Sequence, residues 1–169
     1  MVNKRFFCIM CILAIILCLY GCSNQTSSLE GNSDISNEIW CNPVCLPEDI
    51  DLTNMRMLNI PNRQQYVYKS IDGKNRIVID IHTGDKDTIA IETTQKIDIN
   101  SKEGTTYCYN GEEFTFSGAS TSAASGLVRM IEGETVLEWT QEDAHIRLHG
   151  TYSLDELVAI AEALEVRLP

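Results

Sequence analysis

The residues whose types could carry chemistry are the histidines, because an imidazole can bind a metal ion or transfer a proton. His145 and His149 alternate with apolar residues in a predicted strand, and Arg147 stands between them on the same face. Positions i and i+4 of a strand lie about 13 Å apart, whereas the imidazoles of a zinc site lie about 2 Å from one ion. His82 would have to join from another strand. We therefore predict no metal site here and a strand face exposed to solvent.

The sequence carries no recognisable catalytic motif. A G-x-S-x-G elbow, a Walker motif and an H-E-x-x-H helix are all absent from it. Ser and Thr gather between residues 120 and 125, but no general base is implied beside them. Neighbouring acids such as Glu142 and Asp143 fall in predicted turns, where the two carboxyl groups do not converge on one cleft. We expect no enzymatic activity, no catalytic residues and no cofactor.

The chain begins with an apolar run over residues 6–20, which Lys4 and Arg5 precede. As a helix this run would reach about 22 Å, short of the roughly 30 Å hydrocarbon core of a bilayer. A positive start followed by a short apolar run is typical of a secretory signal peptide. We predict a signal peptide over residues 1–21. An uncleaved anchor, or cleavage at another position, is the alternative.

The apolar run ends in the motif Leu19-Tyr20-Gly21-Cys22. This motif resembles a bacterial lipobox, with an aliphatic residue three positions before the cysteine and a glycine directly before it. The resemblance implies cleavage after Gly21 and a diacylglyceryl thioether on Cys22, with fatty acyl chains of the palmitate type. Such chains anchor a protein with about 0.8 kcal/mol per buried methylene. The expected product is a lipoprotein held by Cys22 on the extracytoplasmic face of the cell membrane.

Three cysteines follow Cys22, namely Cys41, Cys45 and Cys108. A disulfide is permitted outside the cytoplasm. Pro43 can turn the short segment between Cys41 and Cys45, so these two residues are a possible pair. A bridge from either of them to Cys108 is equally open, and so are three free thiols, because spacing alone does not determine connectivity.

The chain is acidic, with 13 Lys and Arg against 24 Asp and Glu and a net charge of −11. Removal of residues 1–21 takes away Lys4 and Arg5 and no acid, so the mature chain is more negative still. An acidic surface argues against binding to nucleic acid and against lying flat on anionic lipid. It keeps the domain soluble and favours a partner with basic groups.

Composition divides the mature chain into a tether and one domain. Residues 22–38 are polar and rich in Ser and Asn, so they cannot offset the entropy lost on ordering. Hydrophobic residues return from Ile39, and the rest of the chain has the usual size of one domain. We predict a disordered tether over 22–38 and a single extracytoplasmic domain over 39–169.

Alternating apolar residues predict several strands in this domain. The segment 76–82 places three isoleucines on one face and leaves Asp80 and His82 on the other. Residues 117–126 are small and polar, which predicts a loop or an irregular edge. Strands are predicted over residues 65–71, 76–82, 88–93, 105–110, 113–116, 133–140 and 144–148.

The end of the domain is predicted to be helical. Ser153 and Glu156 match the S-x-x-E capping box, and apolar residues follow at helical spacing from Leu154 to Leu164. A helix with one apolar face must cover a sheet. The predicted fold class is therefore α+β, a curved antiparallel β-sheet in meander order covered by a C-terminal α-helix.

Two stretches resemble a known family. Residues 136–164, VLEWTQEDAHIRLHGTYSLDELVAIAEAL, read as a strand with Trp139, a strand that ends in Leu148 and Gly150, and a capped helix. Residues 107–116, YCYNGEEFTF, read as a hairpin. Both resemble domain of unknown function 4367, found in envelope proteins of Gram-positive bacteria. That family is similar in turn to lipoprotein-carrier and sigma-factor-regulator folds. The resemblance implies a fold and core roles for Trp139 and the helix leucines, with no catalytic site.

These observations indicate a membrane-anchored extracytoplasmic lipoprotein that acts as a non-catalytic binding, sensory or regulatory module. The expected contacts are the membrane, through lipid on Cys22, and an envelope protein, with no nucleic acid. Two alternatives stay open. One is a carrier of a lipid or another apolar ligand, held between the sheet and the C-terminal helix. The other is an accessory domain of an envelope complex. The identity of the ligand and the oligomeric state are not specified by the sequence.

Overall fold

The computed structural model describes residues 39–89, 93–112, 114–116 and 126–168. All of the described residues belong to one compact unit of the chain. The predicted signal peptide, Cys22 and the tether lie outside the described residues, as do residues 117–125 of the small polar segment. Among the residues described, none of the helices has the length and apolar character needed to cross a membrane.

The main element is a seven-stranded antiparallel sheet with the strand order β2-β3-β4-β10-β9-β7-β6. The order departs from the predicted simple meander, because β10 lies between β4 and β9 although many residues separate it from β4 in the chain. The α+β fold class itself is confirmed. The strands are β2 (Arg56–Ile60), β3 (Arg63–Lys69), β4 (Arg76–Thr83), β6 (Gln95–Ile99), β7 (Lys102–Cys108), β9 (Thr135–Gln141) and β10 (Ala144–Gly150).

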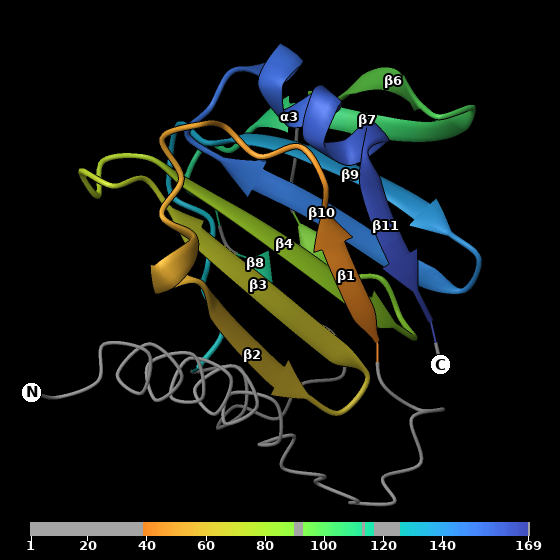
Figure 1. The fold of residues 1–169 in the computed structure, drawn as a ribbon. Helices are drawn as coiled ribbons and strands as arrows, with labels where there is room; N and C mark the ends of the chain where they lie inside the picture. The colour runs from red at the N-terminus through yellow and green to blue at the C-terminus, as the bar shows by residue number, and fades with distance from the viewer. Residues whose placement is uncertain (1–38, 90–92, 113, 117–125, 169) are drawn as a thin grey trace, which may run out of the picture. The chain divides into compact units, whose positions relative to one another are not determined.

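Smaller elements cover both faces of this sheet (Figure 1). One face carries the helix α3 (Leu154–Glu162) and the pair β1 (Trp40–Pro43) and β11 (Leu164–Arg167). The other face carries the pair β5 (Thr88–Ile89) and β8 (Phe114–Thr115), together with residues 126–134. A short 3-10 helix, η2 (Leu52–Asn54), precedes β2. The sheet is thus the middle layer of the domain, and both of its faces contribute buried side chains.

The face toward α3 is apolar. Ile79 and Ile81 of β4 stand opposite Leu148 and Ile146 of β10, and all four side chains are fully buried. The helix buries its own apolar stripe, which includes Leu157, against them. Each such side chain contributes about 1.5–3 kcal/mol through burial. The alternation seen in the sequence therefore points to this core, as predicted.

The C-terminal helix begins as predicted and ends earlier. Ser153 and Glu156 form the predicted capping box, in which the Glu156 carboxylate accepts from the Ser153 backbone N–H at 2.9 Å. The prediction that the helix continues to Leu164 is wrong. Helix α3 ends at Glu162, and Leu164 begins β11, where it pairs with Pro43 of β1. The partner strand comes from the far end of the domain, so helical periodicity in the sequence could not reveal it.

Gly150 ends β10 where another backbone passes very close. A Cβ at this position would lie 2.3 Å from the backbone oxygen of Arg76 in β4. Gly104 in β7 is also crowded, but there the nearest backbone oxygen, that of Glu138, would lie 2.9 Å from the added Cβ. The glycine that ended the predicted strand is thus required by the close contact between β4 and β10.

We predict that Gly150→Ala destabilises the domain by about 1–3 kcal/mol, because β4 and β10 must separate to admit the methyl group. Gly104→Ala is the matched comparison in the same sheet, and its smaller overlap should cost less. Urea unfolding of the two variants and the wild type measures both effects. Equal stability of Gly150→Ala and the wild type would show that the two strands do not approach as described.

Candidate functional site

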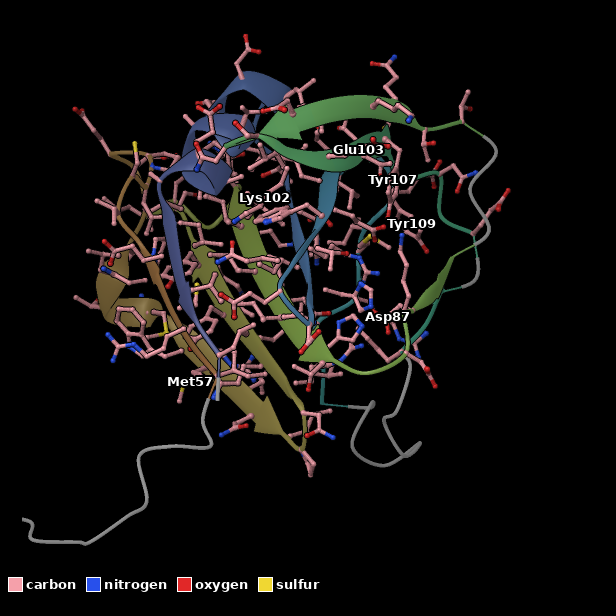
Figure 2. All side chains as sticks on the ribbon, turned by 90° about the vertical axis from the view of Figure 1, so that its right-hand side faces the viewer. Met57, Asp87, Lys102, Glu103, Tyr107 and Tyr109 are labelled. Atoms are coloured by element: carbon pink, nitrogen blue, oxygen red, sulfur yellow. The ribbon has the colours of Figure 1, made fainter. Side chains whose placement is uncertain are left out.

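The sheet face away from α3 is rich in charged side chains, and most of them are buried. Arg147 and His149 of β10 are only 3% and 1% exposed. The expectation that this strand face is open to solvent is therefore wrong. The reason is the covering layer of β5, β8 and residues 126–134, which cannot be predicted from the local sequence pattern of β10. Figure 2 shows Asp87 and Tyr107 on this side of the sheet, opposite α3 and β11.

Five of these side chains form a buried network, which we call the charge cluster: Arg63, Asp80, Asp87, Glu138 and Arg147. Arg63 bonds to Asp80 at 3.0 Å and also to Asp87. Arg147 donates through Nη1 to Asp87 at 2.8 Å and through Nε to Glu138 at 2.6 Å. The cluster joins β3, β4, β9 and β10 to the turn that carries Asp87. Each arginine bridges two carboxylates, an arrangement that offsets the cost of burying charge.

The pKa values of two groups in this cluster, Asp80 and Arg147, are raised for different reasons. Burial raises the pKa of Asp80 to about 6, although Arg63 and Arg147 counteract part of the rise. The pKa of Arg147 is raised above its ordinary value, because its three carboxylate neighbours outweigh the effect of burial. Arg147 thus stays charged, whereas the Asp80 carboxyl takes up a proton at mildly acidic pH.

A second buried pair lies on the same face. The Glu134 carboxylate accepts from His149 Nδ1 at 2.8 Å and from Arg76 Nε at 2.6 Å. Burial by itself would raise the pKa of Glu134, but these hydrogen bonds lower it to about 2. His149 therefore bonds to Glu134. Its separation from His145 agrees with the distance expected between positions i and i+4 of a strand.

The structure brings His82 and His145 together, a pairing that the sequence did not indicate. They stand opposite each other on β4 and β10, and their ring centroids are 5.2 Å apart. His82 Nε2 lies 3.2 Å from the backbone oxygen of Asp85, and Nδ1 has no hydrogen-bond partner among the described residues. Within the described ranges, three or more potential metal-ligating side chains do not gather at any point.

Two hollows border the described domain. The first, here the polar pocket, has a volume of about 120 Å³ and lies beside the charge cluster, on the same face. It extends over β4, β10, β9 and β7, and Glu138 and Arg147 of the charge cluster are part of its lining. Its main polar lining consists of His82, Lys86, Glu103, Thr105, Thr140 and His145.

The second hollow, here the apolar groove, has a volume of about 550 Å³. It lies between the segment that follows β1, the helix η2 and Tyr68 of β3. Three aliphatic side chains in its lining are exposed: Val44, Leu52 and Met55. The groove is lined by Asn42, Pro43, Val44, Leu46, Pro47, Glu48, Ile50, Leu52, Met55 and Tyr68. Its volume is within the range of about 300–1,000 Å³ found for small-molecule sites.

The residues predicted from sequence lie at several separate places. Cys22 is outside the described residues. Cys41 is buried, whereas Cys45 and Cys108 are exposed, and the structure shows no bridge among these three residues. The Cys41–Cys45 bridge stays a prediction. Sequence reasoning missed Arg63, Asp87 and Glu138 altogether. Opposite charges at inward positions of the predicted strands around Asp80, Glu138 and Arg147 were the signal that could have pointed to cross-strand pairing.

A family model described as a domain of unknown function, DUF4367, matches residues 41–164. This chain belongs to the DUF4367 family. The resemblance noted in the last third is thus confirmed, and the match also covers the earlier strands of the domain. Searches of the curated proteins and of the solved structures find no match. The DUF4367 domain must therefore be interpreted from its own geometry.

We predict that Arg147→Met destabilises the DUF4367 domain by about 3–5 kcal/mol, because it leaves Asp87 and Glu138 buried without their shared cation. Lys74→Met is the control. It removes the exposed Lys74–Asp72 pair, whose solvent-screened charges contribute little. Thermal and urea unfolding measure both variants. Similar stability of the two would mean that the cluster contributes no more than a surface pair.

The pH dependence of stability should show the lowered pKa of His82. Burial lowers its pKa from 6.5 to about 4, and nearby Arg63 contributes in the same direction. The folded chain therefore resists protonation of this ring, and stability present above pH 6.5 is lost as the pH falls toward 4. Over this window we expect the wild type to lose up to about 1.4 kcal/mol per pH unit relative to His82→Gln.

Urea unfolding at a series of pH values tests this prediction. The contribution of Asp80, whose raised pKa has the opposite sign, is present in both proteins and cancels in the difference. Parallel curves for the wild type and His82→Gln would show that the His82 ring titrates normally in the folded state.

Burial raises the pKa of Cys41 to about 12. The reactive thiolate is therefore scarce at about pH 8, and we predict that a thiol reagent labels Cys45 and Cys108 in the native domain but not Cys41. Mass spectrometry before and after unfolding counts the labels. If neither Cys41 nor Cys45 reacts after unfolding without reductant, the two form the disulfide that the sequence permits.

Proposed function

We propose that this protein is a lipid-anchored extracytoplasmic lipoprotein whose DUF4367 domain binds a partner in the envelope of a Gram-positive cell and catalyses no reaction. The lipobox-like motif ending in Cys22 supports the anchor, and the polar segment 22–38 supports a tether that keeps the domain away from the bilayer. The lack of a catalytic motif in the sequence supports a binding role.

The apolar groove is the observation that carries the binding role. Leu52 is 66% exposed at a hollow whose lining is otherwise largely apolar. Exposed aliphatic side chains around a concave site are a common feature of surfaces that dock a partner. Glu48 lines the same groove, and the chain has a net charge of −11. The occupant that fits this chemistry is a protein segment with aliphatic side chains next to a Lys or Arg.

The carrier function is the second candidate, and the same groove favours it. The space between the sheet and α3 is filled by buried side chains such as Leu157, Ile160 and Ile79. An acyl chain would therefore occupy the apolar groove and not the position under the helix that the sequence suggested. The protein segment is preferred, because Glu48 and the acidic surface favour basic groups over the anionic headgroups of bacterial lipids.

The two exposed cysteines allow a direct test. Cys45 lies between Val44 and Leu46, which both line the groove, whereas Cys108 lies at the end of β7. A photoreactive maleimide is attached to Cys45 in the full lipidated chain carrying Cys108→Ser, and to Cys108 in the chain carrying Cys45→Ser. Each protein is irradiated in its own membranes, and mass spectrometry identifies the cross-linked peptide or lipid.

We expect adducts from Cys45 alone, to a peptide that contains aliphatic residues and a Lys or Arg. Leu52→Glu should reduce the yield at least tenfold, because it places a charge in the apolar groove. Ile71→Glu, which changes a 76% exposed apolar residue that does not line the groove, should leave the yield unchanged. Lipid adducts in place of peptides would favour the carrier. Equal labelling from both cysteines would refute a groove-specific partner.

A further inference from the structure

We infer that the polar pocket is a second binding site, for a small zwitterion that carries an ammonium and a carboxylate group, the chemistry of a free amino acid. The pocket lies on the sheet face away from α3, whereas the apolar groove is formed by residues of the other face. The two sites share no lining residue. The inference therefore does not depend on the proposed partner-binding function.

Glu138 supplies the acceptor for the ammonium group. Its Oε1 accepts from Arg147 Nε at 2.6 Å and from the Tyr107 hydroxyl at 3.1 Å, so the carboxylate is held in one orientation. The other oxygen, Oε2, lies 3.8 Å from Lys86 Nζ, beyond hydrogen-bond distance. The pocket lining thus includes a carboxylate that is held in one orientation and whose second oxygen can accept from a ligand.

Lys86 supplies the group for the carboxylate of the ligand. Its side chain is 61% exposed and sits in the turn between β4 and β5, facing Glu138. A zwitterion that contacts Lys86 and Glu138 would make two short, charge-assisted contacts, one to each side chain. Because the Lys86 side chain is 61% exposed, it can reorient toward a ligand without disturbing the buried charge cluster.

The charge balance of the lining favours a ligand without net charge. The charge cluster has two arginines and three carboxylates, and Lys86 adds the positive charge that balances them. Glu103 in the lining pairs with Lys96 at 2.7 Å, and burial keeps His82 neutral at physiological pH. A ligand with a net charge would leave one charge unbalanced at the edge of a buried network, which is costly. A zwitterion keeps the balance and uses both signs.

The remaining polar groups can recognise the rest of the ligand. Thr140 Oγ1 and His145 Nδ1, which lie 3.3 Å apart, belong to the pocket lining, as does Thr105. His82 also lines the pocket, is 4% exposed, and has an Nδ1 without a partner among the described residues. A buried imidazole nitrogen without a partner is costly, and a ligand or a bound water can satisfy it. The volume of about 120 Å³ admits only a small molecule.

Calorimetric titration of the full chain in detergent micelles tests the inference. The probes are glycine, L-alanine, L-serine and L-threonine, with methylamine and acetate as molecules that carry one of the two charged groups. We expect at least one amino acid to bind with one-to-one stoichiometry and at least ten times more tightly than methylamine or acetate. No heat with any amino acid at millimolar concentration, or equal binding of methylamine, would overturn the assignment.

Variants then locate the site. Lys86→Gln should weaken binding at least tenfold, and its exposed position makes it compatible with folding. Thr140→Val should weaken binding as well. Lys74→Gln, which changes another exposed lysine outside the pocket, should bind like the wild type. If Lys86→Gln and Lys74→Gln bind equally, the amino acid does not occupy the polar pocket. Leu52→Glu in the apolar groove should leave amino-acid binding unchanged, so the two proposed sites can fail separately.

Discussion

The charge cluster is the interaction on which the rest of the domain depends. Two arginines and three carboxylates are buried together on one sheet face, where an unpaired ion would cost several kcal/mol. Arg147 on the central strand β10 reaches Glu138 on β9 and Asp87 in the turn beyond β4. A shift of one residue in any of these strands would move its charge to the apolar face. The cluster therefore sets the register of the sheet as well as the position of the covering turn.

The layer that covers this sheet face is also held by polar contacts, because buried polar groups need partners. The side chain of Gln65 in β3 donates to the Val128 backbone oxygen at 3.0 Å and accepts from its N–H at 2.7 Å. Arg76 in β4 donates to the backbone oxygen of Arg129 at 2.7 Å. These bonds attach residues 126–134 to the sheet through polar side chains. Apolar contacts around Val136 and Leu127 then add a small second core. The polar face of the sheet is thus buried, because its side chains form hydrogen bonds with the backbone groups of the covering segment.

The two hollows differ in chemistry because they border the two different faces. The apolar groove lies next to η2, and its lining is largely aliphatic because it shares Leu46, Ile50 and Tyr68 with the apolar core. The polar pocket lies beside the charge cluster, and two members of that cluster, Glu138 and Arg147, supply an oriented acceptor and an oriented donor to its lining. The two proposed binding events would therefore take place on opposite faces of the sheet. The central sheet, whose strands contribute to both faces, is the physical connection between them.

The sequence by itself determined the elements with strong local signals. The isoleucines of β4, the Trp139 strand, the glycine at position 150 and the capping box at Ser153 led to the α+β class and to the family. The signals for β1, β2, β6 and β11 were too weak or too short. Leu164, the first residue of β11, stands at helical spacing in the sequence, but a partner strand more than a hundred residues away in the chain decides its conformation.

Only the tertiary structure decided whether the polar side chains of the sheet are buried or exposed. Asp80, His82 and Arg147 alternate with apolar residues just as solvent-facing residues do, so local sequence cannot distinguish an exposed face from a covered one. What separates the two cases is whether another segment supplies opposite charges and backbone partners at the right distance. Here Asp87, Arg63 and Val128 supply them from three separate parts of the chain. Burial of charge is a property of the assembled layers, and it is visible only once those layers are in place.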